Sequence, residues 1–189
     1  MSLKSRLNQF LFVTLRIRKY KLLSDCKSIQ GKPLLHHPAL LKGNGSIIFK
    51  NNVQIGVVNS PGFYSGYTYL EARNNESIIV IGNNVAINNV FSAVAFTSII
   101  IDDNVLIGDN CSISDTDGHF LQPDMRNIDN PPALPVHIMN NVFIGSNVTI
   151  LKGVSIGENS VIGNNAVVTK SIPANVIAAG NPARVIRSL

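Results

Sequence analysis

The chain has 189 residues, of which 45% are hydrophobic and 14% are charged. This length suits one domain with short appendages. A membrane-spanning helix needs about 18 or more apolar residues in a row, and the sequence has no such run. The short apolar stretch 10–15 is followed by Arg16 and Arg18 instead of small residues, so it does not match a secretory signal peptide. We therefore expect a cytoplasmic protein, with the inner face of the membrane as the alternative location.

The net charge of +5 is concentrated at the N-terminus. Residues 1–27 contain seven Lys and Arg against Asp25 alone, which gives +6, and the remainder carries −1. Only this arm suggests nucleic-acid binding, so we do not favour that function. Cys26 and Cys111 lie far apart and match no metal-binding spacing, so no metal site is expected. Cys111 falls on an inward repeat position, which predicts a buried free thiol.

Residues 1–23 have the spacing of an amphipathic helix, with apolar residues at Leu3, Leu7, Phe10 and Leu11 and basic residues on both sides. Such a helix can pack its apolar face on the rest of the protein, which we favour. It can also lie on an anionic membrane. Residues 24–45 contain two Pro and three Gly and are predicted to be a connecting segment.

A repeat of six residues organises the second half of the chain, and a solenoid is predicted over 46–175. An aliphatic residue opens six consecutive blocks: Ile138, Ile144, Ile150, Ile156, Ile162 and Val168. Neither a helix nor a single strand has this period, but a parallel β-helix of short stacked strands does. Asn pairs recur in step with the aliphatic residues, as expected at corners that need positive φ. Residues 60–75 break the pattern and predict an irregular coil with a protruding turn.

The period stops between Asp115 and His137. This stretch contains four prolines and no inward periodicity, and the six-residue blocks resume directly after it. A regular solenoid extrudes such residues as a loop, and loops on rigid scaffolds often carry function.

The repeats resemble those of the hexapeptide-repeat acyltransferases, most closely the galactoside, maltose and polysaccharide O-acetyltransferases. The resemblance is strongest over 78–187. It implies an all-β, left-handed parallel β-helix and a homotrimer with each active site between two subunits. It also implies acetyl-CoA as the donor substrate and a sugar hydroxyl, in surface polysaccharide biosynthesis, as the acceptor.

The predicted catalytic base is His119, which stands in the extruded loop where the resembling enzymes keep a catalytic His. An imidazole can accept a proton near neutral pH, and a nearby carboxylate can fix its tautomer. We choose Asp117 for that role. Asp115 is the alternative, and it could also hold the acceptor.

The resemblance implies further site residues. The backbone N–H of Ser146 would bind the oxyanion, and Phe143 would form an aromatic wall. Asn89 would contact the acceptor, with Asn88 as the alternative because the register is uncertain. Lys170, Arg184 and Arg187, at the end of the coils and in the tail 176–189, would bind the phosphates of CoA.

Three other functions compete with O-acetyl transfer. A non-catalytic structural or interaction solenoid would need neither the loop nor the cationic end. An N-acyltransferase acting on an amino sugar would use a similar site. A zinc enzyme on this fold needs three imidazoles, and the regular coils 78–113 and 138–172 contain no His.

Overall fold

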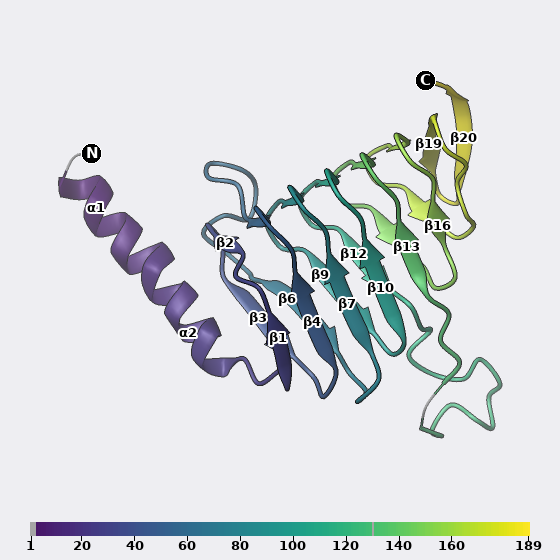
Figure 1. Cartoon of the computed structure of the whole chain (residues 1–189), viewed down its shortest axis with the longest axis horizontal. Coiled ribbons are helices and arrows are strands. Elements are labelled where there is room, and N and C mark those ends of the chain that lie inside the picture. Colours follow the sequence, from purple (N-terminus) through teal and green to yellow (C-terminus); the bar gives the residue numbers. More distant parts are fainter. Residues whose placement is uncertain (1–2, 130) are drawn as a thin grey trace.

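The computed structural model describes residues 3–129 and 131–189. Residues 1 and 2 of the predicted arm and residue 130 of the predicted loop lie outside these ranges. The arm is helical: α1 (Leu3–Gln9) continues through one π-helical segment, η1 (Phe10–Thr14), into α2 (Leu15–Leu23). In Figure 1 it projects from one end of the molecule. No helix within the described ranges is long and apolar enough to cross a lipid bilayer.

The remainder winds as a three-sided solenoid in which successive strands, up to β18, enter sheets A, B and C in turn (Figure 1). Sheet A contains β1 (Ser28–Gln30), β4 (Ser46–Phe49), β7 (Ile78–Ile81), β10 (Ser98–Ile101), β13 (Val136–Ile138) and β16 (Ser155–Ile156). Sheet B contains β2 (Leu34–Leu35), β5 (Gln54–Ile55), β8 (Ala86–Ile87), β11 (Leu106–Ile107), β14 (Phe143–Ile144), β17 (Val161–Ile162), β19 (Val176–Gly180) and β20 (Ala183–Ser188). Sheet C contains β3 (Ala39–Lys42), β6 (Thr68–Ala72), β9 (Ser92–Ala95), β12 (Ser112–Ser114), β15 (Thr149–Ile150) and β18 (Val167–Val168).

The six-residue period sets the core of this left-handed parallel β-helix. The aliphatic residues that open the six blocks are at most 1% exposed. Equivalent residues stack in register from coil to coil, as Ile107, Ile144 and Ile162 do in sheet B. Apolar burial contributes about 25 cal/mol per Å², so each added coil stabilises its neighbours chiefly through these stacks. The predicted core pattern is therefore confirmed.

Asparagine forms the corners, as predicted. Ten asparagines adopt positive φ, which costs Asn less than most residues. At the A–B edge their amides also bond to one another, as Asn52 does to Asn84 and Asn84 to Asn104. These ladders satisfy corner side chains that would otherwise compete for the backbone.

The solenoid begins earlier than predicted. Strands β1, β2 and β3 lie in the segment assigned as a connection, yet they pair with β4, β5 and β6. Their inward residues Ile29, Leu35 and Leu41 continue the six-residue spacing back from Ile47. The turn residues around them obscured this spacing, because Gly and Pro also serve as corners between very short strands.

The solenoid also continues beyond residue 175. Strand β19 pairs with β17 and so extends sheet B into the predicted tail. Strand β20 then folds back antiparallel on β19, which ends the sheet. The last coil is therefore closed by a hairpin.

Two segments leave the regular coils. Loop 57–67 lies between β5 and β6, at the edge where sheets B and C meet, and contains the predicted protruding turn, whereas residues 68–72 of the stretch predicted to be irregular form the regular strand β6. Loop 115–135 lies between β12 and β13, at the edge between sheets C and A, and matches the predicted extruded loop except that residues 136 and 137 already belong to β13. We refer to these positions as the B–C edge and the C–A edge.

Candidate functional site

His119 lies near the start of loop 115–135, on the C–A edge, with an exposed side chain. Its Nδ1 is 2.8 Å from the carbonyl oxygen of Arg126 in the same loop. A carbonyl oxygen can only accept a hydrogen bond, so Nδ1 carries the proton. Nε2 of the neutral ring is then an unprotonated acceptor, which is the form that a general base needs.

Two pockets meet at His119. The larger, of about 600 Å³, is mostly polar, and its lining includes Arg73, Asn74, Phe96, Arg126 and Asp129. The smaller, of about 200 Å³, includes Phe120, Leu121, Met125 and Lys152. A base between two pockets can reach groups bound in either one.

Arg73 is held rigidly at the larger pocket. Its guanidinium donates two hydrogen bonds of 2.9 Å to Glu71 and lies 4.8 Å from the centre of the Phe96 ring. The hydrogen bonds to Glu71 raise the pKa of Arg73. A fixed guanidinium at a pocket wall is suited to hydroxyl or carboxylate oxygens.

Neither predicted aspartate orients His119, and that prediction is wrong. Asp115 is fully buried and accepts hydrogen bonds from the backbone N–H of Phe96 (2.8 Å) and from the N–H and hydroxyl of Thr97 (2.7 and 2.9 Å). Asp117 pairs with Lys152. The free backbone N–H groups of the preceding corner hold the first carboxylate, and a lysine of the next coil holds the second. The Arg126 carbonyl fills the predicted role.

The predicted acceptor contact by Asn89 is also contradicted. Asn89 is fully buried, and its Oδ1 accepts from the Val57 N–H at 3.1 Å. Its Nδ2 donates to the carbonyls of Val57 and Pro61 at 3.1 and 3.0 Å. Loop 57–67 therefore uses this side chain fully as an anchor. Asn88 is partly exposed, but its amide bonds to Ser60 and to the N–H of Asn89.

Ser146 and Phe143 lie on sheet B and the adjoining B–C edge. Phe143 points outward from β14 and is about half exposed. The Ser146 N–H donates to Asn164 Oδ1 at 2.8 Å, and its hydroxyl bonds to Asp109. The predicted oxyanion donor is thus already occupied by the corner of the next coil.

The predicted site residues fall on two different edges of the solenoid. The C–A edge carries His119, Asp117 and Lys170. The B–C edge and the adjoining face carry Ser146 and Phe143. Sheet C separates the two edges, so one protomer does not bring both sets together.

The three predicted phosphate-binding cations are exposed at the C-terminal end. Lys170 follows β18, whereas Arg184 and Arg187 lie on β20. Within the described ranges none of them forms a salt bridge, and the two arginines bond only to nearby carbonyls. They are free for an anionic ligand, although they are placed on different faces.

The remaining ionisable candidates are structural. Cys111 is buried, and burial raises the pKa of its thiol to about 11, so it is a poor nucleophile at neutral pH. His37 is buried, with Nε2 within 3.2 Å of two carbonyls of loop 57–67, and burial lowers its pKa. No group of three His, Cys, Asp or Glu suited to a metal ion occurs in residues 3–129 and 131–189.

Sequence reasoning missed Arg126 and Lys152. The role of Arg126 belongs to its carbonyl, and no side-chain pattern signals a backbone acceptor. The Lys152 position could have been found from the repeat, because the corner before β16 follows loop 115–135 by one coil. Coil register alone places Lys152 beside the base of that loop.

Comparison with known proteins agrees with this geometry. The model of the bacterial transferase hexapeptide (six repeats) family matches residues 135–170. The galactoside O-acetyltransferase of Escherichia coli K12 is 38% identical over 94% of this chain and 89% of its own length. A solved galactoside acetyltransferase in complex with coenzyme A is 39% identical, with a TM-score of 0.59 over 74% of this chain and 65% of that one.

A second solved structure extends the likeness. The polySia-specific acetyltransferase NeuO is 26% identical, with a TM-score of 0.63 over 86% of this chain and 83% of its own. The repeat and the fold thus recur in proteins named as acetyltransferases. The chain belongs to the hexapeptide-repeat family of acetyltransferases.

Proposed function

We propose that this protein transfers the acetyl group of acetyl-CoA to a hydroxyl group of a sugar, with His119 as the general base. The observation that carries the proposal is the His119 ring, whose Nδ1–H is held by the Arg126 carbonyl while Nε2 stays free between two pockets. The likeness to a galactoside O-acetyltransferase over most of both chains supports it.

The reaction needs only groups that the protein and its substrates supply. Nε2 of His119 removes the proton of the acceptor hydroxyl, and the oxygen attacks the thioester carbonyl carbon. The tetrahedral intermediate collapses as the C–S bond breaks, and His119 returns the proton to the sulfur of CoA. General-base catalysis of this kind contributes about 10²–10⁴-fold to the rate.

The larger pocket suits a sugar acceptor. Its lining offers hydrogen-bonding groups from Asn74, Arg126 and Asp129 together with the aromatic ring of Phe96. Sugars present hydroxyl edges and apolar ring faces, and both features find partners here. A precursor of a surface polysaccharide fits this class, and the similarity to an acetyltransferase specific for a polysaccharide supports that choice.

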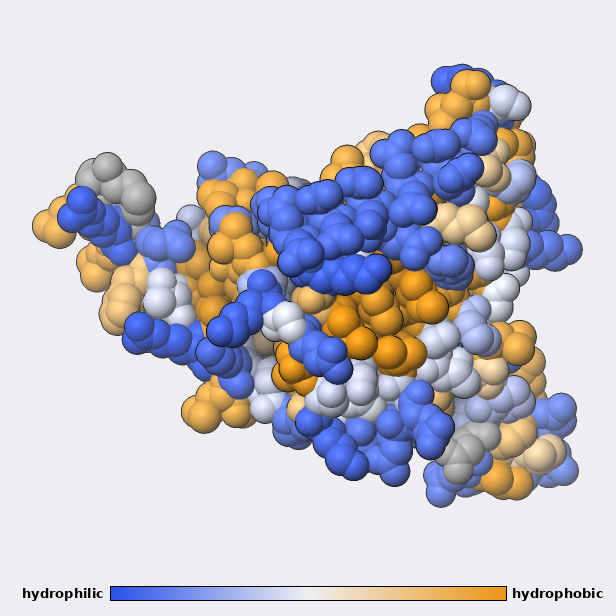
Figure 2. Space-filling view, in the orientation of Figure 1, coloured by the Kyte–Doolittle hydropathy of each residue, from blue (hydrophilic) through white to orange (hydrophobic). Residues whose placement is uncertain are grey.

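The complete site lies between two subunits of a homotrimer. The C–A edge of one protomer supplies His119, and the B–C edge of its neighbour supplies Phe143 and Ser146. A three-fold axis would pair these edges three times, as cyclic symmetry requires. Partly exposed Ile48, Val80 and Ile100 lie in register on the outer face of sheet A, an apolar strip suited to subunit contact. Figure 2 shows this apolar surface in the middle of the view, over β7 and β10.

Ser146 can take part in this mechanism only after a local rearrangement. Its N–H can stabilise the oxyanion only when Asn164 Oδ1 turns away from it. Lys170, Arg184 and Arg187 bind the phosphates of CoA, and they act from the same end of the solenoid. The enzyme works at the cytoplasmic face of the membrane, where acetyl-CoA and polysaccharide precursors meet.

The direct test is an acceptor screen with acetyl-CoA, read by release of the CoA thiol. Galactosides, maltose and oligosaccharides of surface polysaccharides are the acceptors to try, with amino sugars as the comparison. Acetylation of a hydroxyl by the wild type, lost in His119→Asn, is the expected result. An enzyme that acetylates only amines would contradict the proposed acceptor.

Donor binding has its own test. Arg184→Ala and Arg187→Ala should each weaken CoA binding about tenfold or more, because a charge-assisted hydrogen bond contributes about 1.5–3 kcal/mol. Dephospho-CoA should lose less affinity than CoA. Equal losses for both ligands, measured by calorimetry, would show that these arginines do not bind the 3′-phosphate.

A further inference from the structure

The first coil leaves its apolar interior uncovered. Ile29, Leu35 and Leu41 occupy the inward positions of β1, β2 and β3 and pair with fully buried residues of the next coil. Ile29 is nevertheless 44% exposed, whereas its partner Ile47 is fully buried. The reason is position: no coil stacks on the first one, and helix α2 runs beside this end without covering it.

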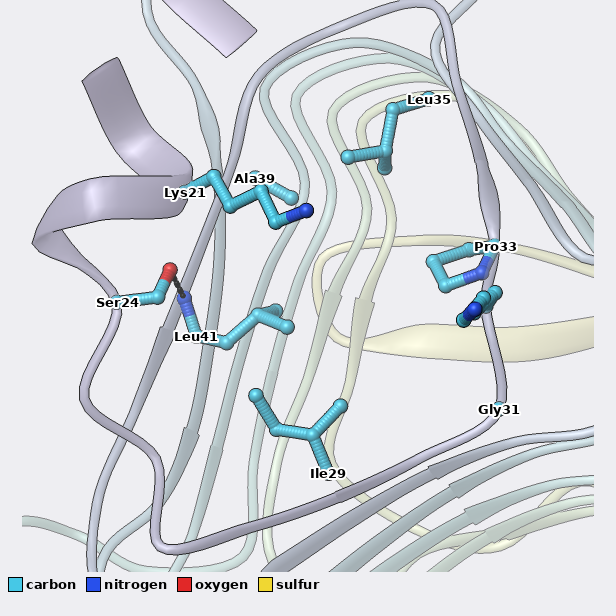
Figure 3. Close-up of a pocket in the computed structure, with 9 residues that line it drawn as sticks. Lys21, Ser24, Ile29, Gly31, Pro33, Leu35, Ala39 and Leu41 are labelled. Atoms are coloured by element: carbon cyan, nitrogen blue, oxygen red, sulfur yellow. Dashed lines mark hydrogen bonds between the residues drawn. The ribbon is translucent and has the colours of Figure 1, made fainter. Parts of the chain in front are cut away.

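The uncovered interior forms a pocket of about 440 Å³ with a mostly apolar lining (Figure 3). Ile29, Leu35 and Leu41 surround it in the close-up, and Pro33 lies on the far side. Lys21 extends from α2 toward its mouth, and Lys32 also belongs to the lining. An apolar cavity with an ammonium group at its mouth and a second lysine in its lining suits an anionic amphiphile.

The helical arm is fixed to the body along one side. Arg16 donates hydrogen bonds to the carbonyls of Phe63, at 3.0 Å, and Gly66. The ring of Tyr20 stacks on that of Tyr67 with 4.5 Å between centroids, and Val13 is buried. The packing predicted for the arm is therefore present, but these residues account for only one face of it.

The other face of the arm is apolar and exposed. Leu3, Leu7, Leu11 and Leu15 follow one another every four residues, Leu22 comes seven after Leu15, and Phe10 comes three after Leu7. Residues four apart drift around a regular α-helix by about 40° per step. The wider π-helical turn of η1 offsets part of this drift, so Leu15 and Leu22 stay in line with Leu7. In Figure 2 apolar residues line the arm at the left of the view, among hydrophilic ones.

Positive charge is concentrated at the same end. Residues 1–70 hold ten Lys and Arg against Asp25 alone, a net charge of +9, and residues 71–189 carry −4. Asp25 is paired with Lys42. Exposed Lys4, Arg6, Arg18 and Lys19 lie on the arm itself. The apolar surface is therefore surrounded by cations and has almost no acidic neighbours.

We propose that this end of the molecule, made of the outer face of the arm and the open first coil, docks on an anionic lipid surface. The apolar side chains enter the acyl boundary, and the cations meet the lipid phosphates. A second copy of the chain is a less suitable partner, because contact between two such ends would bring two sets of positive charges together and they would repel each other. The inference does not depend on the proposed acetyl transfer.

Vesicle co-sedimentation of the full chain tests the proposal. Binding should be clear with vesicles of phosphatidylcholine containing about 30% phosphatidylglycerol, weak with phosphatidylcholine alone, and reduced by added salt. Leu7→Gln/Leu11→Gln keeps the charge and should weaken binding at least about tenfold. Lys4→Gln/Lys19→Gln should weaken it about fivefold per lysine, and only for the anionic vesicles.

The matched control is Ile186→Gln/Leu189→Gln. These two residues are more exposed than Leu7 and Leu11 but lie at the opposite end of the solenoid. This variant should bind vesicles as the wild type does. Equal losses in both double variants would overturn the proposal, because the effect would not be specific to the N-terminal end.

Two further outcomes would overturn it. One is a full-length protein that binds no vesicle at any content of phosphatidylglycerol. The other is end-to-end self-association, seen by light scattering without lipid and abolished by Leu7→Gln/Leu11→Gln, which would assign the apolar face to a second copy. Acetyl transfer to a soluble acceptor should be unchanged in this variant, so failure of docking and failure of the proposed activity are distinguishable.

Discussion

The two loops that leave the solenoid differ in what holds them. Loop 57–67, on the B–C edge, is tied to the body by buried Asn89, by His37 and by Arg16. Loop 115–135, on the C–A edge, is anchored at its base by Asp115, and a bridge between Thr116 and Ala133 closes its neck. Beyond that neck its side chains are mostly exposed.

The difference indicates that loop 57–67 has a structural role and that loop 115–135 has a chemical one. In loop 57–67 the anchoring groups are buried or partly buried and bond to backbone groups of the loop: the Asn89 amide, Nε2 of His37 and the Arg16 guanidinium. In loop 115–135 the anchors stop at the base, and His119 keeps a free ring nitrogen between two pockets. Substitutions at the B–C edge should therefore change the free energy of unfolding. Substitutions in loop 115–135, on the C–A edge, should change the rate of acetyl transfer.

The largest expected effect is on the rate of acetyl transfer in His119→Ala. The rate should fall about 10²–10⁴-fold at neutral pH, because the base is lost. The free energy of unfolding should change by no more than about 1 kcal/mol, since the side chain is exposed. Thiol release and denaturant unfolding measure the two quantities. His119→Asn keeps a polar side chain without a base and should behave alike.

The contrary outcome for His119 is simple to recognise. A His119→Ala enzyme that folds, binds acetyl-CoA and acetylates at a near-normal rate would remove it from the mechanism. His137, on β13 just after the loop, would not replace it easily, because its Nε2 already bonds to Asp102 at 2.8 Å.

Asn89→Ala should have the largest effect on stability. Removing the amide leaves the Val57 N–H and the Pro61 carbonyl without their partner in a buried place. We expect the free energy of unfolding to fall by about 2–4 kcal/mol, measured by urea denaturation. Asn88→Ala, in the same corner but partly exposed, is the control and should cost about 1 kcal/mol. Similar losses for the two would contradict the anchoring role of Asn89.

Asp117→Asn should have a small effect on both quantities. It weakens a pair with Lys152 that is partly exposed, and such pairs contribute about 0–1 kcal/mol. Acetyl transfer should stay within a few-fold of the wild-type rate, because the Arg126 carbonyl orients His119. A loss of rate approaching that of His119→Ala would show that the Asp117 carboxylate does take part in the active site.

The smallest effect concerns pH and His37. Burial lowers its pKa in the folded state, so below the ordinary histidine value of about 6.5 the unfolded chain binds a proton that the folded chain does not. Its contribution to stability is therefore present above that pH and is lost as the pH falls. His37→Gln should lose less stability than the wild type between pH 7.5 and pH 5.5, measured by urea denaturation. Equal losses would show that His37 does not titrate on unfolding.

The periodic parts of the fold could be predicted from the sequence, but most of the hydrogen bonds at the candidate site could not. The spacing from Ile138 to Val168 was enough for the core, because each inward position repeats the same physical requirement. The spacing of Ile29, Leu35 and Leu41 carried the same information, but proline and glycine around it resembled a linker. Asn89 could not be distinguished from its corner equivalents by residue type. The contact of the Arg126 carbonyl with His119 could not be predicted, because the pattern of side chains does not indicate which backbone carbonyl accepts a hydrogen bond.

The central claim is that two edges from two subunits make one active site, and mixed trimers test it most directly. His119→Ala and Phe143→Asp should each be inactive alone, the first for lack of the base and the second for lack of the aromatic wall. Co-expressed in equal amounts, they should recover roughly a quarter of the wild-type activity per trimer, because one interface in four joins an intact His119 edge to an intact Phe143 edge. Mixed trimers with no more activity than either parent would contradict a shared site.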